Sequence, residues 1–373
     1  MLYFDNAATS GTKPESVLLA VSAAMRFSAN PGRGSHKLSL ACAEEVRKCR
    51  ILLAKFFDGE NYENTIFTKN CTEALNIALF GLLTRGDHVV TTCMEHNSVL
   101  RPLEALKNAG VITYDICELE GDGISPERLV SLVKPNTKAA VVTSASNVTG
   151  AVNDLKKIRA LLPERVLLIV DGAQGGGHLP LKMRETGIDA LCLAGHKGLL
   201  GIQGSGALLF SDRASPNPLM FGGTGSESYS LAMPDFYPDA LEAGTLSYPA
   251  IKSLFEGITY LCVHGKEIST RLYRFSAILI RGLKRLNAYR VYSKPNTCGI
   301  VAFEHKTHPS EYLSLLLSQK YDMATRGGLH CAPLMHRALG TETGGLVRAS
   351  FGFDTTERQV DALLQALGEI ADK

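Results

Sequence analysis

LCLAGHKGLLGIQG, residues 191–204, runs from apolar residues into a His-Lys pair and then into a glycine-rich segment. A second apolar run, residues 166–170, lies upstream and ends in Asp171-Gly-Ala-Gln174. Short apolar runs that stop at a functional group are typical of α/β enzymes, which present such groups at the carboxyl ends of their strands. Here the groups are a carboxylate, Asp171, and an amine, Lys197. This pair suits pyridoxal phosphate, whose ring nitrogen needs an anionic partner and whose aldehyde needs a lysine. A solvated surface lysine is the alternative for Lys197.

The size and composition of the chain indicate a globular protein of two domains. It has 373 residues, 45% hydrophobic and 20% charged, with a mean hydropathy of +0.04, and single cores stop growing near roughly 250–300 residues. A formal charge of +2 gives no basis for attraction to nucleic acid or membranes. Neither a signal peptide nor an apolar run of ~20 residues is present. The nine cysteines form no CxxC pair, so we expect reduced, mostly buried thiols, a cytoplasmic location and no metal site.

Between residues 64 and 210 the pattern alternates between strand and helix. Such alternation predicts an α/β fold with a mostly parallel central sheet and helices on both faces. Strands are predicted at residues 65–68, 87–91, 111–115, 138–143, 166–170, 190–193 and 207–210, with helices at 74–83, 97–108, 125–133 and 153–161.

The flanking segments complete the predicted organisation. Helices are expected at residues 14–27 and 40–57, and Arg33 and His36 lie in a turn-rich connector as exposed loop residues. Residues 221–249 are rich in Gly, Ser, Pro and Tyr and predict a long structured loop. A helix over residues 251–286 is expected to bridge to a smaller α+β region, with strands near 297–303, 324 and 346–351 and helices at 309–319 and 356–370. We predict an N-terminal segment, 1–15, that packs near the active site, a large domain, 16–250, and a small C-terminal domain, 251–373.

Polar residues follow several predicted strands, and parallel strands deliver such residues to one edge of a sheet. Cys71 and Thr72 begin a helix, where free N–H groups suit an anion, although simple capping is the alternative. His96 could stack on an aromatic ring and relay protons, or be a polar loop residue. Asn147 could hold a carboxylate or the phenolic oxygen of a cofactor, or form an Asx turn.

Two further candidates lie near the C-terminus. Cys331 lies in a glycine-flanked loop, residues 326–333, next to His330. This setting favours a reactive thiol over a buried structural one, because a nucleophilic cysteine needs exposure and nearby positive charge. Arg348 could clamp a substrate carboxylate through both arms of its guanidinium, the alternative being a surface ion pair.

The ordered motifs YFDNAATS, NPGRGSHKLS, NCTEALN, MEHNSVLRP, SNVTG, VDGAQ, AGHKGLLGIQGSG, EAGT, RGGLHCAPL and VRASFGFDTTERQVD span nearly the whole chain. Together they resemble the cysteine desulfurase and selenocysteine lyase family, in the class V aminotransferase group of fold-type I pyridoxal-phosphate enzymes. The resemblance implies a large cofactor-binding domain, a smaller C-terminal domain and a homodimer.

The resemblance also implies residue roles. Lys197 is similar to the lysine that binds the cofactor aldehyde, Asp171 to the partner of the ring nitrogen, Gln174 to the ligand of the phenolic oxygen and His96 to the histidine stacked on the ring. Phosphate ligands are implied at Cys71, Thr72 and His196, and at Thr245 across the dimer interface. Substrate contacts are implied at Asn147, Arg348 and Ala8, and Cys331 resembles the nucleophile that receives sulfur as a persulfide.

Two positions depart from the family pattern. Ala194 stands where many relatives carry a phosphate-binding serine, and Leu329 replaces a histidine that is common before the His-Cys pair. The short spacing from Cys331 to Arg348 resembles the group with a short, ordered cysteine loop.

The resemblance implies conversion of L-cysteine to L-alanine, with the sulfur passed from Cys331 to an acceptor protein or small thiol. A selenocysteine lyase acting on L-selenocysteine is the nearest alternative. Another pyridoxal-phosphate-dependent C–S lyase, an aminotransferase and a non-catalytic scaffold or sulfur-carrier-binding protein are the others.

Overall fold

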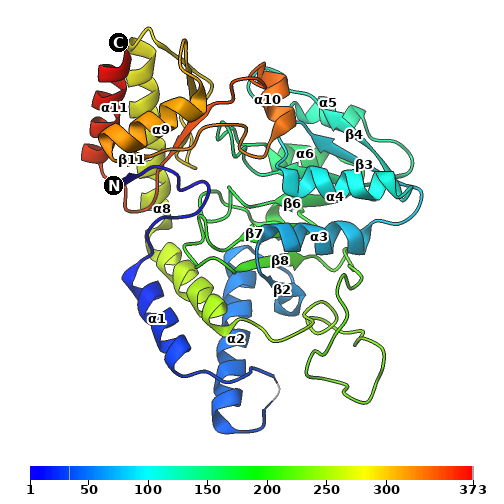
Figure 1. The fold of residues 1–373 in the computed structure, drawn as a ribbon. Helices are drawn as coiled ribbons and strands as arrows, with labels where there is room; N and C mark the ends of the chain where they lie inside the picture. The colour runs from blue at the N-terminus through cyan, green and yellow to red at the C-terminus, as the bar shows by residue number, and fades with distance from the viewer. Residues whose placement is uncertain (33, 372–373) are drawn as a thin grey trace.

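The computed structural model describes residues 1–32 and 34–371 and is built around a seven-stranded sheet, whose place among the helices is shown in Figure 1. Its strand order is β2-β8-β7-β6-β5-β3-β4. Strand β8 is antiparallel to both of its neighbours, and the other pairs are parallel. A loop joins β7 directly to β8, and antiparallel neighbours need no crossover helix. The predicted mostly parallel α/β sheet is therefore confirmed. The strands are β2 (Thr65–Thr68), β3 (Asp87–Thr92), β4 (Ile112–Cys117), β5 (Thr137–Thr143), β6 (Leu167–Asp171), β7 (Ala190–Ala194) and β8 (Gly206–Phe210).

Helices cover both faces of this sheet, because successive strand residues point to opposite sides. On β5, Val141 packs in the core cluster that includes α3 (Cys71–Leu82) and α4 (Asn97–Asn108), whereas Val142 packs in the cluster on the other face. That second face is covered by α2 (Lys37–Phe56), α5 (Pro126–Ser131), α6 (Leu155–Leu161) and α8 (Tyr248–Arg285). The predicted helices are present. α3 begins earlier than expected because Asn70 caps it, its side chain accepting the Glu73 N–H at 2.9 Å.

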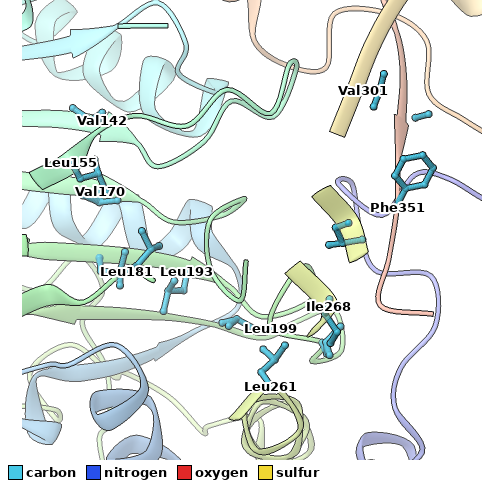
Figure 2. Close-up of a cluster of buried hydrophobic side chains, with 14 of the residues drawn as sticks. Val142, Leu155, Val170, Leu181, Leu193, Leu199, Leu261, Ile268, Val301 and Phe351 are labelled. Atoms are coloured by element: carbon cyan, nitrogen blue, oxygen red, sulfur yellow. The ribbon is translucent and has the colours of Figure 1, made fainter. Parts of the chain in front are cut away.

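The 38-residue helix α8 links the large sheet to the C-terminal part of the chain. Figure 2 shows the core running from strand residues such as Val170 and Leu193, past Leu261 and Ile268 of α8, to Phe351. The predicted helix over residues 251–286 is therefore present, while its role as a bridge between two domains stays a prediction. α1 (Glu15–Arg26) packs along α8, and irregular backbone precedes α8, as the composition of residues 221–249 predicts.

Two small sheets complete the fold. One has the antiparallel order β12-β10-β9, and the other pairs β1 in parallel with β11. The β1 pairing was not predicted, since two residues carry no periodic pattern; it fixes the N-terminus beside the C-terminal region (Figure 1). The domain boundaries stay a prediction. The remaining elements are β1 (Leu2–Tyr3), β9 (Tyr289–Val291), β10 (Ile300–His305), β11 (Met323–Ala324), β12 (Val347–Ser350), η1 (Tyr62–Asn64), α7 (Met183–Thr186), α9 (Ser310–Tyr321), α10 (Pro333–Leu339) and α11 (Glu357–Ala371).

Three further expectations concern single residues. Every cysteine is a free thiol and seven are buried, but Cys262 is exposed on α8, so the expectation of a buried thiol is wrong there. His36 is exposed as expected, although it also caps α2 by accepting the Ser39 N–H. Arg33 lies outside the described residues.

Within the described residues, none of the helices has the length and apolar character needed to cross a bilayer.

Candidate active site

A cavity of about 230 Å³ lies at the carboxyl edge of the large sheet and contains every predicted site residue except Thr245. Asp171 ends β6, Lys197 follows β7, and Asn147 follows β5. Cys331 and Arg348 enter from the C-terminal part of the chain, and Ala8 enters from the N-terminal segment. The predicted convergence of strand ends is therefore present.

The carboxylate at the end of β6 is held by two donors. Asp171 is 2% exposed, and its Oδ1 accepts the Ala173 N–H at 2.8 Å and the Cys71 thiol at 3.4 Å. Burial raises the pKa of the Cys71 thiol well above its usual value, so this thiol stays protonated and donates. Gln174 uses its Nε2 to donate to the Ala7 carbonyl at 3.0 Å. A buried carboxylate held in this way can pair with a cationic ring nitrogen.

The amine in the same cavity is chemically activated. Burial lowers the pKa of Lys197, while Asp171 acts in the opposite direction. A lysine with a lowered pKa loses its proton more readily and becomes a nucleophile or a base. The next residue must be glycine, because a Cβ on Gly198 would lie 2.2 Å from the Gly176 carbonyl oxygen. This close backbone approach fixes the turn that presents Lys197.

Donor groups gather beside the first turn of α3, whose N–H groups lack intrahelical acceptors. Asn70 caps this helix, so Thr72 does not have to. Thr72 Oγ1 lies 3.0 Å from Ser98 Oγ, which lies 2.7 Å from His96 Nδ1. We assigned no role to Ser98 from the sequence; its position two residues beyond His96 is the signal that was available.

Histidines around the cavity are uncharged at neutral pH. His96 caps α4, its Nδ1 accepting the Ser98 N–H at 3.0 Å, and burial lowers its pKa to about 4. Burial, helped by Lys197 and Lys13, also lowers the pKa of His196 to about 4. The buried Nδ1 of His196 has no hydrogen-bond partner within the described part of the chain. It is therefore available to a ligand.

The cysteine loop is held in an unusual backbone conformation. His330 and Cys331 have φ values of 50° and 57°, in the left-handed region that disfavours side chains. Asn147 Nδ2 donates to the His330 carbonyl at 2.7 Å, and the Asn97 N–H donates to the Cys331 carbonyl at 2.8 Å. Cys331 is exposed and lines the cavity, so the alternative of a buried structural thiol is wrong.

The residues flanking this thiol do not supply a positive imidazole. His330 is buried, and desolvation with the nearby Arg348 lowers its pKa to about 2. Leu329, which departs from the family pattern, is 42% exposed. Positive charge near Cys331 comes instead from Arg326 and Arg348, which line the same cavity. Arg326 was treated only as the start of the loop motif in the sequence.

Arg348 is engaged within the protein. It is 2% exposed; its Nη2 pairs with Asp5 Oδ1 at 2.8 Å and its Nη1 donates to the Asn147 carbonyl at 2.8 Å. The alternative of a surface ion pair is therefore wrong, because the pair is buried. Nε is buried without a partner among the described residues. Bidentate binding of a substrate carboxylate by Arg348 requires that Asp5 release Nη2. The predicted role of Arg348 in substrate binding stays a prediction.

Two predicted positions need separate comment. Thr245 lines a different cavity, of about 130 Å³, together with Phe67 and Glu242, and does not reach the site within one chain. Ala194 lines the main cavity with a methyl group where a serine would offer a hydroxyl.

These residues fit pyridoxal phosphate. Asp171 and Lys197 offer the carboxylate and the amine, and the first turn of α3 with Thr72 offers donors to an anion. The unpartnered Nδ1 of His196 adds a polar group that the protein leaves unsatisfied. A buried polar atom without a partner is costly, and a ligand at this point would satisfy it.

The sequence and the structure both match known proteins over nearly their full length. The profile of the aminotransferase class-V family matches residues 2–363. A probable cysteine desulfurase of Methanothermobacter thermautotrophicus is 32% identical, with 99% of this chain and 94% of the relative covered. A cysteine desulfurase of Pectobacterium carotovorum is 28% identical, with 99% and 93% covered.

Solved structures agree. The apo structure of a cysteine desulfurase from Thermococcus onnurineus superposes with a TM-score of 0.91 at 28% identity, covering 100% of this chain and 94% of that one. The cysteine desulfurase CsdA of Escherichia coli superposes with a TM-score of 0.87 at 25% identity, with 99% and 94% covered.

Proposed function

Because the chain belongs to the aminotransferase class-V family, and within it to the cysteine desulfurases, we propose that it converts L-cysteine to L-alanine and takes the sulfur onto Cys331. One observation carries this proposal: an exposed thiol, Cys331, lines the same cavity as Lys197 and Asp171. An ordinary aminotransferase has no need of such a thiol.

Members of this family depend on pyridoxal phosphate, and the residues of this chain that would hold it are Cys71, Thr72, His96, Asp171, Gln174, His196 and Lys197. When bound, the cofactor supplies an electron-withdrawing ring that loosens the bonds of the amino-acid substrate. Asp171 would favour a positive charge at the ring nitrogen. Lys197 Nζ, whose pKa burial lowers, takes and returns the proton of the substrate Cα.

Cys331 performs the sulfur transfer. As a thiolate, its Sγ attacks the sulfur of the substrate, forming a sulfur–sulfur bond while the carbon–sulfur bond breaks. The electron pair of the broken bond stays with the carbon skeleton, which gains a proton and leaves as alanine. The thiol of Cys331 is oxidised to the persulfide level and the substrate carbon is reduced, so no further oxidant is required. Arg326 and Arg348 line the same cavity as Cys331.

The remaining expectations complete the proposal. We infer that Asn147, Arg348 and Ala8 contact the substrate, and that an acceptor protein or small thiol in the cytoplasm takes the sulfur. Thr245 would reach the phosphate bound by a second copy in a homodimer. Its position in a separate cavity, away from Lys197, supports this assignment.

The test uses the two exposed cysteines as a matched pair. Purified protein is incubated with L-cysteine, and the alanine formed is quantified. Mass spectrometry then gives the mass of the peptide that contains Cys331. A gain of about 32 mass units marks one added sulfur. We expect Cys331→Ala to abolish alanine formation and Cys262→Ala to leave it intact. Pyruvate or another keto acid in place of alanine would contradict the proposal.

Selenocysteine distinguishes the nearest alternative. A selenolate leaves more easily than a thiolate, so release of selenium need not depend on Cys331. If Cys331→Ala loses activity with cysteine but keeps it with selenocysteine, while the wild type strongly prefers selenocysteine, the protein is a selenocysteine lyase. Loss with both amino acids supports the desulfurase.

A further inference from the structure

A single carbonyl oxygen, that of His196, accepts four hydrogen bonds from the N-terminal segment. The Ser10 N–H donates at 3.0 Å, Ser10 Oγ at 3.0 Å, Thr9 Oγ1 at 3.2 Å and Lys13 Nζ at 3.3 Å. A carbonyl oxygen has two lone pairs, so this number of donors is unusual. The carbonyl belongs to the peptide bond between His196 and Lys197. Because a peptide is planar, the orientation of this carbonyl also fixes the backbone nitrogen of Lys197.

Lys13 differs from the other three donors because it carries a charge. Its side chain is half-buried, it also donates to Ser10 Oγ, and among the described residues it makes no ion pair. Burial lowers its pKa to about 8. Its charge contributes to the lowered pKa of His196, so the amine acts on the site electrostatically as well as by contact.

Burying part of an ammonium group without a carboxylate costs free energy. Surface lysines avoid this cost by extending into solvent. Within the described part of the chain, the Lys13 ammonium donates to the His196 carbonyl and to Ser10 Oγ. Hydrogen bonds from charged donors are roughly twice as strong as those from neutral ones. The ammonium thus adds the one charged donor among the four, at the longest of the four distances, 3.3 Å.

We propose that Lys13 is a positioning residue that fixes the His196–Lys197 peptide through the His196 carbonyl and so prepares the cavity for an aldehyde cofactor with a phosphate group. The inference rests on the proposed function for the identity of that cofactor. In the proposed function, His196 would contact the phosphate of that cofactor and Lys197 its aldehyde. One well-oriented peptide therefore sets both contacts.

The experiment measures the affinity of the apo-protein for pyridoxal phosphate by absorbance titration. Lys13→Met keeps the length of the side chain and removes its donors and charge. We expect it to weaken binding by about tenfold, the effect of losing one charge-assisted contact. Lys13→Arg, which can still donate to the same carbonyl, should stay within about threefold of the wild type.

Lys182 provides the matched control. Its Nζ donates to the Phe56 carbonyl at 2.6 Å, so it makes the same kind of contact away from the cavity. Lys182→Met should stay within about twofold of the wild type, the usual scale of a surface change. Unchanged binding by Lys13→Met, or equal weakening by Lys13→Arg and Lys13→Met, would overturn the proposal.

A second measurement needs neither the cofactor nor a variant. Acetic anhydride labels the wild-type apo-protein, and mass spectrometry compares Lys13 with the exposed Lys37. The labelling is repeated over a range of pH, and we expect the reaction of Lys13 to rise at a lower pH than that of Lys37, because burial lowers the pKa of Lys13 to about 8. The same pH dependence for both lysines would show that Lys13 is not buried against the His196 carbonyl. If the wild type bound no pyridoxal phosphate, the proposed function would fail, while this labelling would still decide whether Lys13 holds the His196 carbonyl.

Discussion

The side-chain amide of Asn147 donates a 2.7 Å hydrogen bond to the carbonyl of His330, which ties the end of β5 to the loop that carries Cys331. We predicted from the sequence that Asn147 binds a ligand, and the structure gives it this additional contact. The Oδ1 of Asn147 is buried with no partner among the described residues. One amide group thus connects the cavity with the nucleophile.

Asn147→Ala should loosen this loop. The left-handed conformations of His330 and Cys331 each cost about 1–3 kcal/mol and persist only where surrounding contacts impose them. We expect faster hydrogen exchange in residues 326–333 and about tenfold slower desulfuration, in line with the loss of one buried hydrogen bond. Asn153→Ala is the matched control, because the buried Asn153 donates to the Thr143 carbonyl at 2.8 Å without touching the loop. Equal exchange in both variants would contradict this role.

Glu95 should make stability depend on pH. It is 0% exposed; its Oε1 accepts from Thr92 Oγ1 at 2.7 Å and from the Thr143 N–H at 2.9 Å, and burial raises its pKa from 4.5 to about 8. Its contribution is complete below pH 4.5 and is lost as pH rises towards 8, because only the unfolded chain ionises freely in that range. Relative to Glu95→Gln, the wild type should lose up to ~1.4 kcal/mol per pH unit.

Urea unfolding of both proteins at about pH 5.5 and about pH 7.5 measures this difference directly. The lowered pKa values of His96 and His196 act in the opposite sense, since their contribution is lost as pH falls below 6.5. Both proteins share these histidines, so their effect cancels in the comparison. A stability difference that stays constant between the two pH values would rule out a neutral Glu95.

Much of the site could be predicted because its residues follow apolar strands. Asp171 and Lys197 each come directly after a run whose pattern predicts a strand, and parallel strands bring such ends together. The same reasoning predicted that His96 and Asn147 lie at this edge of the sheet, and both line the cavity there. The sheet order and the antiparallel β8 could not be predicted, because strand pairing is a long-range property that periodicity does not encode.

Contacts between the two ends of the chain could not be predicted from the sequence either. Arg348 pairs with Asp5, and the Ala7 N–H donates to Ser350 Oγ at 2.9 Å across 343 positions. The sequence around Arg348 predicts a strand with an exposed or substrate-facing arginine, and it carries no sign of the buried partner. The N-terminal segment looked like a polar loop because its hydrogen bonds are made with distant backbone groups.

Pyridoxal phosphate should stabilise the folded chain by binding it in preference to the unfolded one. At a free concentration of about 100 times Kd, the free energy of unfolding should rise by about 2.7 kcal/mol. Lys197→Ala should reduce this gain. At the same concentration as pyridoxal phosphate, pyridoxal, which lacks the phosphate, should also give a smaller gain, because the donors at the first turn of α3 would then have no anion to bind. Thermal unfolding with and without each compound is the measurement. Equal gains in stability for both compounds would contradict an anion site at the first turn of α3.

Arg50 and Glu242 form an ion pair in which both side chains are only 6% exposed. The two terminal nitrogens of Arg50 lie 2.8 and 2.9 Å from the two oxygens of Glu242, which also accepts the Phe67 N–H at 2.7 Å. This pair ties α2 to the segment that carries Thr245. Arg50→Met should cost about 3–5 kcal/mol, because it leaves a carboxylate buried without its cation.

Removing the unpaired charge of Glu242 should recover part of the stability lost in Arg50→Met. In Arg50→Met with Glu242→Gln, the glutamine carbonyl can still accept the Phe67 N–H, while the uncompensated charge is gone. We therefore expect the double variant to be more stable than Arg50→Met alone, a reversal that additive effects cannot produce. Urea unfolding of the wild type, both single variants and the double variant completes the cycle. A loss below about 1 kcal/mol for Arg50→Met would mean that the pair behaves like one in solvent and does not fix the Thr245 segment.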